Sequence, residues 1–144
     1  MGSFIENSQQ IISEFEMFGD WMDKYNYIIE MGKSLPIIDE KYKTDSFLIN
    51  GCQSQVWLYA DYSDGKVHFT ADSDAIITKG IVNILIRVLS GLTTEEIINA
   101  DMGFIDKVGL REHLSPTRSN GLNSMIKQMK LYALVYKTKF ETKN

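Results

Sequence analysis

Residues 56–71 have the sequence VWLYADYSDGKVHFTA, which is typical of a β-hairpin. In residues 56–62 apolar side chains alternate with polar and aromatic ones, so this segment can form a strand with two different faces. Ser-Asp-Gly at residues 63–65 favours a turn, because glycine adopts a positive φ without steric cost. Residues 66–71 then resume the strand pattern. We therefore predict a small antiparallel sheet built on this hairpin.

The chain after the hairpin has helical patterns. Residues 72–74, Asp-Ser-Asp, are expected to cap a very apolar helix that ends before Gly91. Residues 93–96 match a capping box, which predicts the start of a short helix. Ser-Pro at residues 115–116 introduces a last long helix, and the lysine-rich residues 137–144 after it are expected to fray.

The chain before the hairpin is predicted to be mostly helical. Apolar residues at helical spacing indicate helices over residues 11–18 and 21–31, and Asp20 is placed to cap the second. Residues 33–46 contain a proline and several charges without a clear period, which indicates an irregular connection. Residues 47–49, Phe-Leu-Ile, are predicted as a short strand.

Length and composition limit the possible architecture and partners. With 144 residues, of which 44% are hydrophobic, the chain has the usual size of one domain. We predict a single domain over residues 1–144 of the α+β class, in which a small antiparallel β-sheet is covered by several helices. The net charge of −4 excludes nucleic-acid binding through a basic surface, because neutralising phosphates requires clustered positive charge.

The cysteine count and the distribution of apolar residues bear on location. Cys52 is the only cysteine, so intrachain disulfides and multi-cysteine metal sites are excluded, and a reducing compartment is expected. The N-terminal sequence MGSFIENSQQ does not resemble a secretory signal. The most apolar stretch, residues 81–89, is interrupted by Asn83 and Arg87 and does not predict a membrane span. We therefore expect a cytoplasmic protein with no membrane partner.

Cys52 is the first candidate for chemistry. It lies in GCQSQ, residues 51–55, between two apolar segments, so a loop is expected to present its side chain. A lone cysteine is most often a small buried hydrophobe without a chemical role. A Cys–His hydrolase is an alternative, with His68 or His113 as the base that activates the thiol. The spacing of these three residues matches no usual zinc site.

Arg118 and two aspartates are also ambiguous from the sequence alone. Arg118 lies in SPTRSNG, residues 115–121, at the predicted start of a helix, where free backbone N–H groups suit an anion. The alternative is that Arg118 makes an ordinary surface ion pair and that Ser115 or Ser119 caps the helix. Asp72 and Asp74 are good residues for a helix start and could also contact a partner, and nothing in the sequence makes them a catalytic pair.

Four separated blocks of the sequence resemble the SufE family of sulfur-acceptor proteins. The central block is GCQSQVWL, residues 51–58, and the others agree with the family in the same order along the chain. These are WMDKYNYIIEMGKSLP at residues 21–36, DSDAIITKG at residues 72–80 and HLSPTRSNGLNSMI at residues 113–126. The resemblance covers most of the chain.

The resemblance implies a specific function. A SufE protein accepts a sulfane sulfur on the cysteine of this motif, here Cys52, from the persulfide of a SufS-like cysteine desulfurase. It stimulates that enzyme and passes the sulfur toward an iron–sulfur scaffold, acting as a covalent carrier and activator rather than as a self-contained enzyme. Pyridoxal phosphate belongs to the desulfurase, so no cofactor is expected here. The implied fold is similar to that of IscU-type cluster scaffold proteins.

The resemblance also implies the surroundings of the reactive sulfur. Gly51, Gln53 and Ser54 flank Cys52, while Asp74 and Arg118 are expected on the face that meets the partner, with Arg118 near the cysteine loop. In the family this loop packs against the body of the domain and swings out toward the desulfurase. From their nearness in sequence we expect these apolar residues to line the shelter: Phe47, Leu48, Val56 and Trp57.

Overall fold

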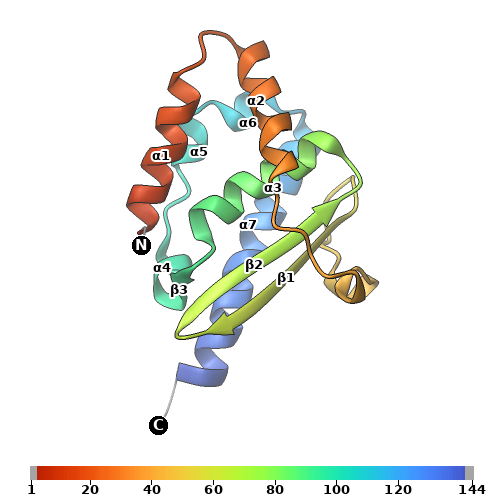
Figure 1. Ribbon diagram of the computed structural model, residues 1–144, viewed down its shortest axis with the longest axis vertical. Helices are drawn as coiled ribbons and strands as arrows, with labels where there is room; N and C mark the ends of the chain where they lie inside the picture. Colours follow the sequence, from red (N-terminus) through yellow and green to blue (C-terminus); the bar gives the residue numbers. More distant parts are fainter. Residues whose placement is uncertain (1–2, 142–144) are drawn as a thin grey trace.

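The predicted hairpin is present in the computed structural model, which describes residues 3–141 (Figure 1). Strand β1, Val56–Ser63, pairs antiparallel with β2, Lys66–Ser73, and the side chains of β1 alternate between buried and accessible positions at its start. Asp64 and Gly65 form the turn with positive φ angles of 53° and 76°. A short third strand, β3, Leu92–Thr93, pairs with β2 on its other edge and gives the order β1-β2-β3.

Helices and short helical turns make up most of the remaining chain. The α-helices are α1 Phe4–Glu16, α2 Trp21–Lys33, α3 Ile76–Leu89, α4 Thr94–Asn99, α5 Phe104–Lys107, α6 Leu110–His113 and α7 Pro116–Tyr136. The short turns are η1 Glu40–Tyr42, η2 Asp45–Phe47 and η3 Lys137–Glu141. The α+β prediction is confirmed. No helix within residues 3–141 is long and apolar enough to cross a membrane.

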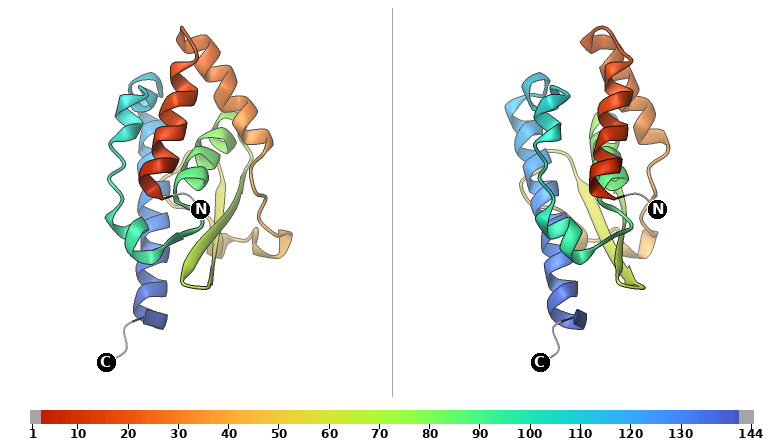
Figure 2. Two further views of the ribbon diagram at one scale, coloured as in Figure 1. Left: turned by 60° about the vertical axis from the view of Figure 1, so that its left-hand side comes forward. Right: turned by 90° about the vertical axis from the view of Figure 1, so that its left-hand side faces the viewer.

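Helix α3 is the centre of the core. Nearly all of its residues are buried, and it contacts β2, α1, α2 and α7. It crosses α2 at very short distance, because a Cβ on Gly80 would overlap the carbonyl oxygen of Ile28. α1 and α2 form an antiparallel pair at one end of the molecule, while α7 runs along its length (Figure 2). The site described below lies where α3, α7 and the chain before β1 meet.

The segment between α2 and β1 crosses the outer face of the sheet. It starts at the free edge of β2, where Ile37 bridges Ala71, and it ends beside β1, where Leu48 bridges Trp57. Between these two bridges the Tyr42 ring stacks on Tyr59, with 3.9 Å between ring centroids. This crossing fixes the position at which the chain reaches the cysteine loop.

Several predictions about local structure need correction. Residues 47–49 do not form a strand, because η2 takes up Phe47 and a single bridge at Leu48 replaces a ladder. The first helix begins at Phe4, earlier than predicted, with Ser3 in a capping box. Residues 137–141 are ordered as η3, in which Glu141 accepts hydrogen bonds from Tyr62 and Thr94. The rest of the predicted frayed tail, residues 142–144, lies outside the described residues.

The capping prediction for residues 72–74 is also wrong in part. The N-cap of α3 is Ala75, which makes no side-chain capping bond. Asp72 instead pairs with Lys43 at 3.0 Å, and Asp74 accepts a hydrogen bond from the backbone of Gln55 at 3.1 Å. Only Ser73 acts near the helix start, by accepting from the Ala75 N–H at 3.3 Å. These side chains therefore hold neighbouring segments together rather than capping the helix.

A partly buried ion pair joins α1 to α3. Arg87 donates to the two oxygens of Glu14 at 2.7 and 2.6 Å, and Tyr27 also donates to this carboxylate. The hydrogen bond from Arg87 holds the pKa of Glu14 below its usual 4.5. A carboxyl with a lowered pKa stabilises the fold above its unfolded-state pKa, and this contribution is lost as the pH falls through the lowered value.

We expect Glu14→Gln to lower the free energy of unfolding by about 1 kcal/mol at neutral pH, a figure reduced for the partial exposure of the pair. Denaturant unfolding of both proteins, repeated as the pH falls below about 4, measures the effect. The difference in unfolding free energy between the two proteins should disappear in acid, because the wild-type carboxyl then becomes protonated. A difference that stayed constant with pH would contradict the assignment to this ion pair.

Candidate functional site

Cys52 lies in the loop of residues 49–55, between η2 and β1. Both ends of this loop are tied down. Ile49 N–H donates to the Val56 carbonyl at 2.8 Å, which closes the base of the loop. The Gln55 carbonyl accepts from the Ser73 hydroxyl at 2.7 Å, and the Gln55 N–H donates to Asp74. The predicted site residue Asp74 therefore anchors the loop, while its side chain remains on the exposed surface.

The tip of the loop, residues 50–54, is held much more weakly. Within the described chain, no backbone group of these residues hydrogen-bonds to a residue outside the loop. Gly51 has a φ of 94°, a conformation that favours glycine, and a Cβ at this position would collide with the hydroxyl oxygen of Ser124 on α7. Few hydrogen bonds and a tied base are the features of a segment that opens locally at low cost.

The Cys52 thiol packs against the start of α7. It donates a weak hydrogen bond to the Gly121 carbonyl, with 3.6 Å between sulfur and oxygen, and it is partly exposed. The absence of a side chain on Gly121 makes this approach possible, because a Cβ there would lie 3.4 Å from the sulfur. Burial raises the pKa of the Cys52 thiol, since desolvation disfavours the thiolate. In this position the sulfur is a protonated, weak nucleophile.

A cavity of about 60 Å³ lies beside the sulfur. It is larger than the space that one water molecule requires, so one additional sulfur atom fits. The loop, α3 and α7 all contribute to its wall. The residues that line it are Cys52, Gln53, Ser54, Thr78, Ile81, Arg118, Gly121 and Met125. The structure thus brings together four of the predicted site residues, while Gly51 lies next to them in the loop.

Arg118 supplies positive charge at this cavity. Its guanidinium donates to the Tyr25 hydroxyl at 3.1 Å, and within residues 3–141 it makes no ion pair with a carboxylate. Ser115 caps α7 by accepting from the Arg118 N–H at 3.2 Å, as the sequence predicts. Tyr25 was not predicted, because the contact joins residues 93 positions apart. A cation in the wall can stabilise an anion bound in the cavity, while burial still raises the pKa of the Cys52 thiol itself.

The predicted apolar shelter is wrong. None of the four residues expected to line it borders the cavity. Phe47 packs edge-on against Tyr59, and Trp57 lies under the Lys43 ammonium at 4.9 Å. The wall comes instead from Thr78 and Ile81 of α3 and from α7, which no argument from adjacency in sequence could identify. The residues immediately before and after the loop are used to pack the segment that crosses the sheet.

The two histidines lie away from the cysteine. His113 stacks on Trp21, with 3.9 Å between ring centroids, and its Nδ1 is 2.9 Å from the Gly109 carbonyl. His68 is exposed on the outer face of the sheet, in a different cavity beside Tyr42 and Asp61. Neither histidine lines the Cys52 cavity. Among the described residues, no group of three or more histidine, cysteine or carboxylate side chains is arranged to hold a metal ion.

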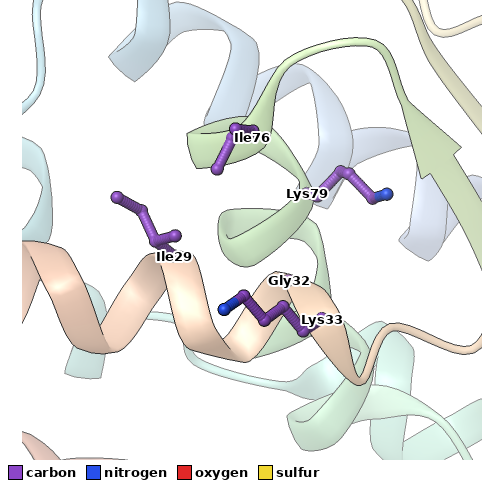
Figure 3. Close-up of a pocket in the computed structure, with 5 residues that line it drawn as sticks. All are labelled: Ile29, Gly32, Lys33, Ile76 and Lys79. Carbon is purple, nitrogen blue, oxygen red and sulfur yellow. The ribbon is translucent and has the colours of Figure 1, made fainter.

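A separate pocket lies between α2 and α3 (Figure 3). It has a volume of about 140 Å³, and Ile29 and Ile76 point into the space between the helices. The two lysines at its rim already have partners, since Lys33 pairs with Glu30 at 2.9 Å and Lys79 lies 3.6 Å from Asp72. Among the residues that line this pocket there is no cysteine, so the Cys52 cavity is the candidate site for thiol chemistry.

Comparison with known proteins assigns the family. The family described as "SufE: Fe-S metabolism associated domain" matches residues 9–133. The chain belongs to the SufE family. It therefore carries a domain associated with iron–sulfur metabolism.

The SufE relationship extends over nearly the whole chain. An uncharacterized SufE-like protein of Rhizobium meliloti (strain 1021) is 42% identical over 84% of this chain and 90% of its own length. Another, from Rhizobium etli, is 41% identical over 92% of this chain and 93% of its own length. A third, from Synechocystis sp., is 37% identical over 90% of this chain and 82% of its own length.

The SufE fold is also found in a solved structure. The solution structure of a hypothetical protein from Thermus thermophilus superposes with a TM-score of 0.77, covering 92% of this chain and 96% of the other. Only 20% of the residues are identical, so the similarity supports the fold and no particular activity.

Proposed function

We propose that this SufE-family chain is a sulfur acceptor and carrier. It takes the outer sulfur of a persulfide on a SufS-like cysteine desulfurase by transpersulfuration. The Cys52 thiolate attacks the outer sulfur, a new S–S bond forms at Cys52, and the S–S bond of the donor breaks. The donor cysteine leaves as a thiolate and takes up the proton that Cys52 gave up. Sulfur moves at constant oxidation state, so no external oxidant or reductant is needed.

The observation that carries this proposal is the placement of Cys52. It lies at the tip of a loop whose base is tied and whose tip has no backbone hydrogen bond to the rest of the described fold. Its sulfur faces a cavity that fits one more sulfur atom and has Arg118 at its wall. A carrier needs two positions of its cysteine: one packed against the cavity, where the bound sulfur is held, and one outside, where the cysteine reaches the donor.

The raised pKa of Cys52 fits such a cycle. In the packed position the thiol stays protonated, which limits its reaction with other electrophiles. When the loop moves into a partner's site, the thiol leaves the buried environment and the cause of the raised pKa is removed. Removing sulfur from the donor cysteine then accelerates turnover of the desulfurase. Pyridoxal phosphate would remain in that enzyme, and this chain would need no cofactor.

The further steps of the proposal follow from this chemistry. The loaded chain would pass its sulfur to an iron–sulfur scaffold, in keeping with the metabolism that the family description names. Cys52 is the only cysteine, so no neighbouring thiol can attack the persulfide and release the sulfur as sulfide. The proposed compartment is the cytoplasm, where the thiol would stay reduced.

Two alternatives remain to be separated from the carrier by experiment. In a self-contained thiol hydrolase His68 or His113 would activate Cys52, but neither borders the cavity. In an adaptor protein Cys52 would be inert and only the surface would matter. The loop geometry favours the carrier over both.

Alanine release by a SufS-like desulfurase, with cysteine as substrate, tests the proposal. Adding this chain should increase the rate. Arg118→Ala should lower the stimulated rate about tenfold at limiting chain concentration, because the cation in the cavity wall is lost. Arg118→Lys keeps the charge but not the planar geometry, so its stimulated rate should lie between those of the wild type and Arg118→Ala.

The double variant His68→Ala/His113→Ala is the matched control, since both rings lie outside the site. It should stimulate like the wild type, whereas a hydrolase would lose its activity. If the wild-type chain stimulated none of several desulfurases of this class, the carrier function would be contradicted.

A further inference from the structure

Thr78 is a polar residue in an unusual position. It lies on α3, is 5% exposed, and lines the Cys52 cavity. Within residues 3–141 its hydroxyl makes no hydrogen bond, in contrast to the other buried threonine, Thr94, which donates to Glu141 at 2.8 Å. A threonine in a helix commonly satisfies its hydroxyl on the carbonyl one turn earlier, and Thr78 does not. Among the described residues the fully enclosed side-chain atom without a partner is Asn83 Oδ1, so the Thr78 hydroxyl keeps some access to solvent and is free to bind a partner that enters the cavity.

The cavity can supply that partner when Cys52 is loaded. Its volume of about 60 Å³ accommodates an additional atom beside the Cys52 sulfur. Threonine in a helix populates two χ1 rotamers, so a change of rotamer can redirect the hydroxyl. Elsewhere the two helices contribute Ile81, Gly121, Met125 and Arg118 to the wall, while the loop contributes Gln53 and Ser54. Thr78 is therefore the one hydroxyl donor of the rigid α3 wall among the described residues.

We infer that Thr78 donates a hydrogen bond to the outer sulfur of a Cys52 persulfide and so retains the cargo in the cavity. This inference rests on the proposed function, because it requires that Cys52 be loaded. The anionic persulfide carries its charge on the outer sulfur, where a hydroxyl donor and the Arg118 guanidinium both stabilise it. Thr78 lies on a core helix rather than on the loop, so the bond would also close the loop over its cargo.

The lifetime of the loaded state tests the role of Thr78. Wild type, Thr78→Val and Thr78→Ser would be loaded with a desulfurase and cysteine, freed of both, and exposed to dithiothreitol. Intact mass would then follow the loss of the sulfur atom over time and pH. Valine has the shape of threonine without the hydroxyl, while serine keeps the hydroxyl. We expect all three to load, Thr78→Val to lose sulfur about tenfold faster, and Thr78→Ser to stay near wild type.

A second measurement separates the hydrogen bond from looser packing. The unloaded proteins would be alkylated at Cys52, and the three rates should agree, because no persulfide is present. Equal sulfur lifetimes for wild type and Thr78→Val would overturn the inference while leaving the carrier function intact. Faster alkylation of unloaded Thr78→Val would also overturn it, by assigning Thr78 a packing role. Failure of the wild type itself to load would overturn the carrier function together with this inference.

Discussion

Cys52→Ser is expected to abolish stimulation of the desulfurase completely while leaving the fold and the docking surface intact. Serine is close to cysteine in shape, and its hydroxyl can donate to the Gly121 carbonyl that accepts from the thiol. It cannot accept a sulfane sulfur to form a persulfide. Alanine release measures the lost stimulation, and titration calorimetry with the desulfurase measures the retained binding.

A Cys52→Ser chain that binds the desulfurase but accepts no sulfur should also act as an inhibitor. An excess of Cys52→Ser should inhibit stimulation by the wild-type chain, because both compete for the same donor site. Stimulation by Cys52→Ser equal to that of wild type would identify the chain as an adaptor whose cysteine is inert. Loss of both stimulation and binding would require a check of folding by circular dichroism.

Gly51→Ala is expected to expose Cys52. A residue with a side chain is strained at a φ of 94°, and the new Cβ would collide with the Ser124 hydroxyl. Together these effects should cost the packed loop about 1–3 kcal/mol, which corresponds to an increase in the open population of about 5- to 150-fold. The rate of Cys52 alkylation by iodoacetamide at fixed pH should rise by a similar factor.

Ser124→Ala provides the matched control for Gly51→Ala. It removes the colliding oxygen and does not weaken α7, because alanine has a higher helix propensity than serine. In the double variant Gly51→Ala/Ser124→Ala, Cys52 should therefore be alkylated at a rate between those of the wild type and Gly51→Ala. The increase over the wild-type rate that remains would be due to backbone strain at residue 51. If Gly51→Ala reacted at the wild-type rate, the packed loop would not protect the thiol.

Local sequence signals predicted the secondary structure well where each element is determined by its own residues. The hairpin turn at Asp64 and Gly65, the capping box at Thr93 and the Ser115 cap are confirmed. Each depends on contacts within about four residues. The strand predicted at residues 47–49 is wrong because its one bridge depends on the distant Trp57, and local β-propensity does not reveal such a partner.

The site was predictable only in part for the same reason. The motif around Cys52 and its resemblance to the SufE family pointed to the cysteine loop and to Arg118. The cavity wall comes from α3 and α7, so Thr78 and Gly121 required the tertiary structure. Adjacency in sequence suggested Phe47 and Trp57 instead, and both pack elsewhere.

Covalent acceptance of sulfur at Cys52 is tested most directly by intact mass spectrometry. The purified chain would be incubated with a SufS-like desulfurase and cysteine, with Cys52→Ser treated in parallel, and the modified residue located by peptide mapping. The account predicts that the wild type gains the mass of one sulfur atom on Cys52, that a reducing thiol removes it, and that the variant gains nothing. A wild-type mass unchanged with several desulfurases of this class, or an equal gain in Cys52→Ser, would contradict it.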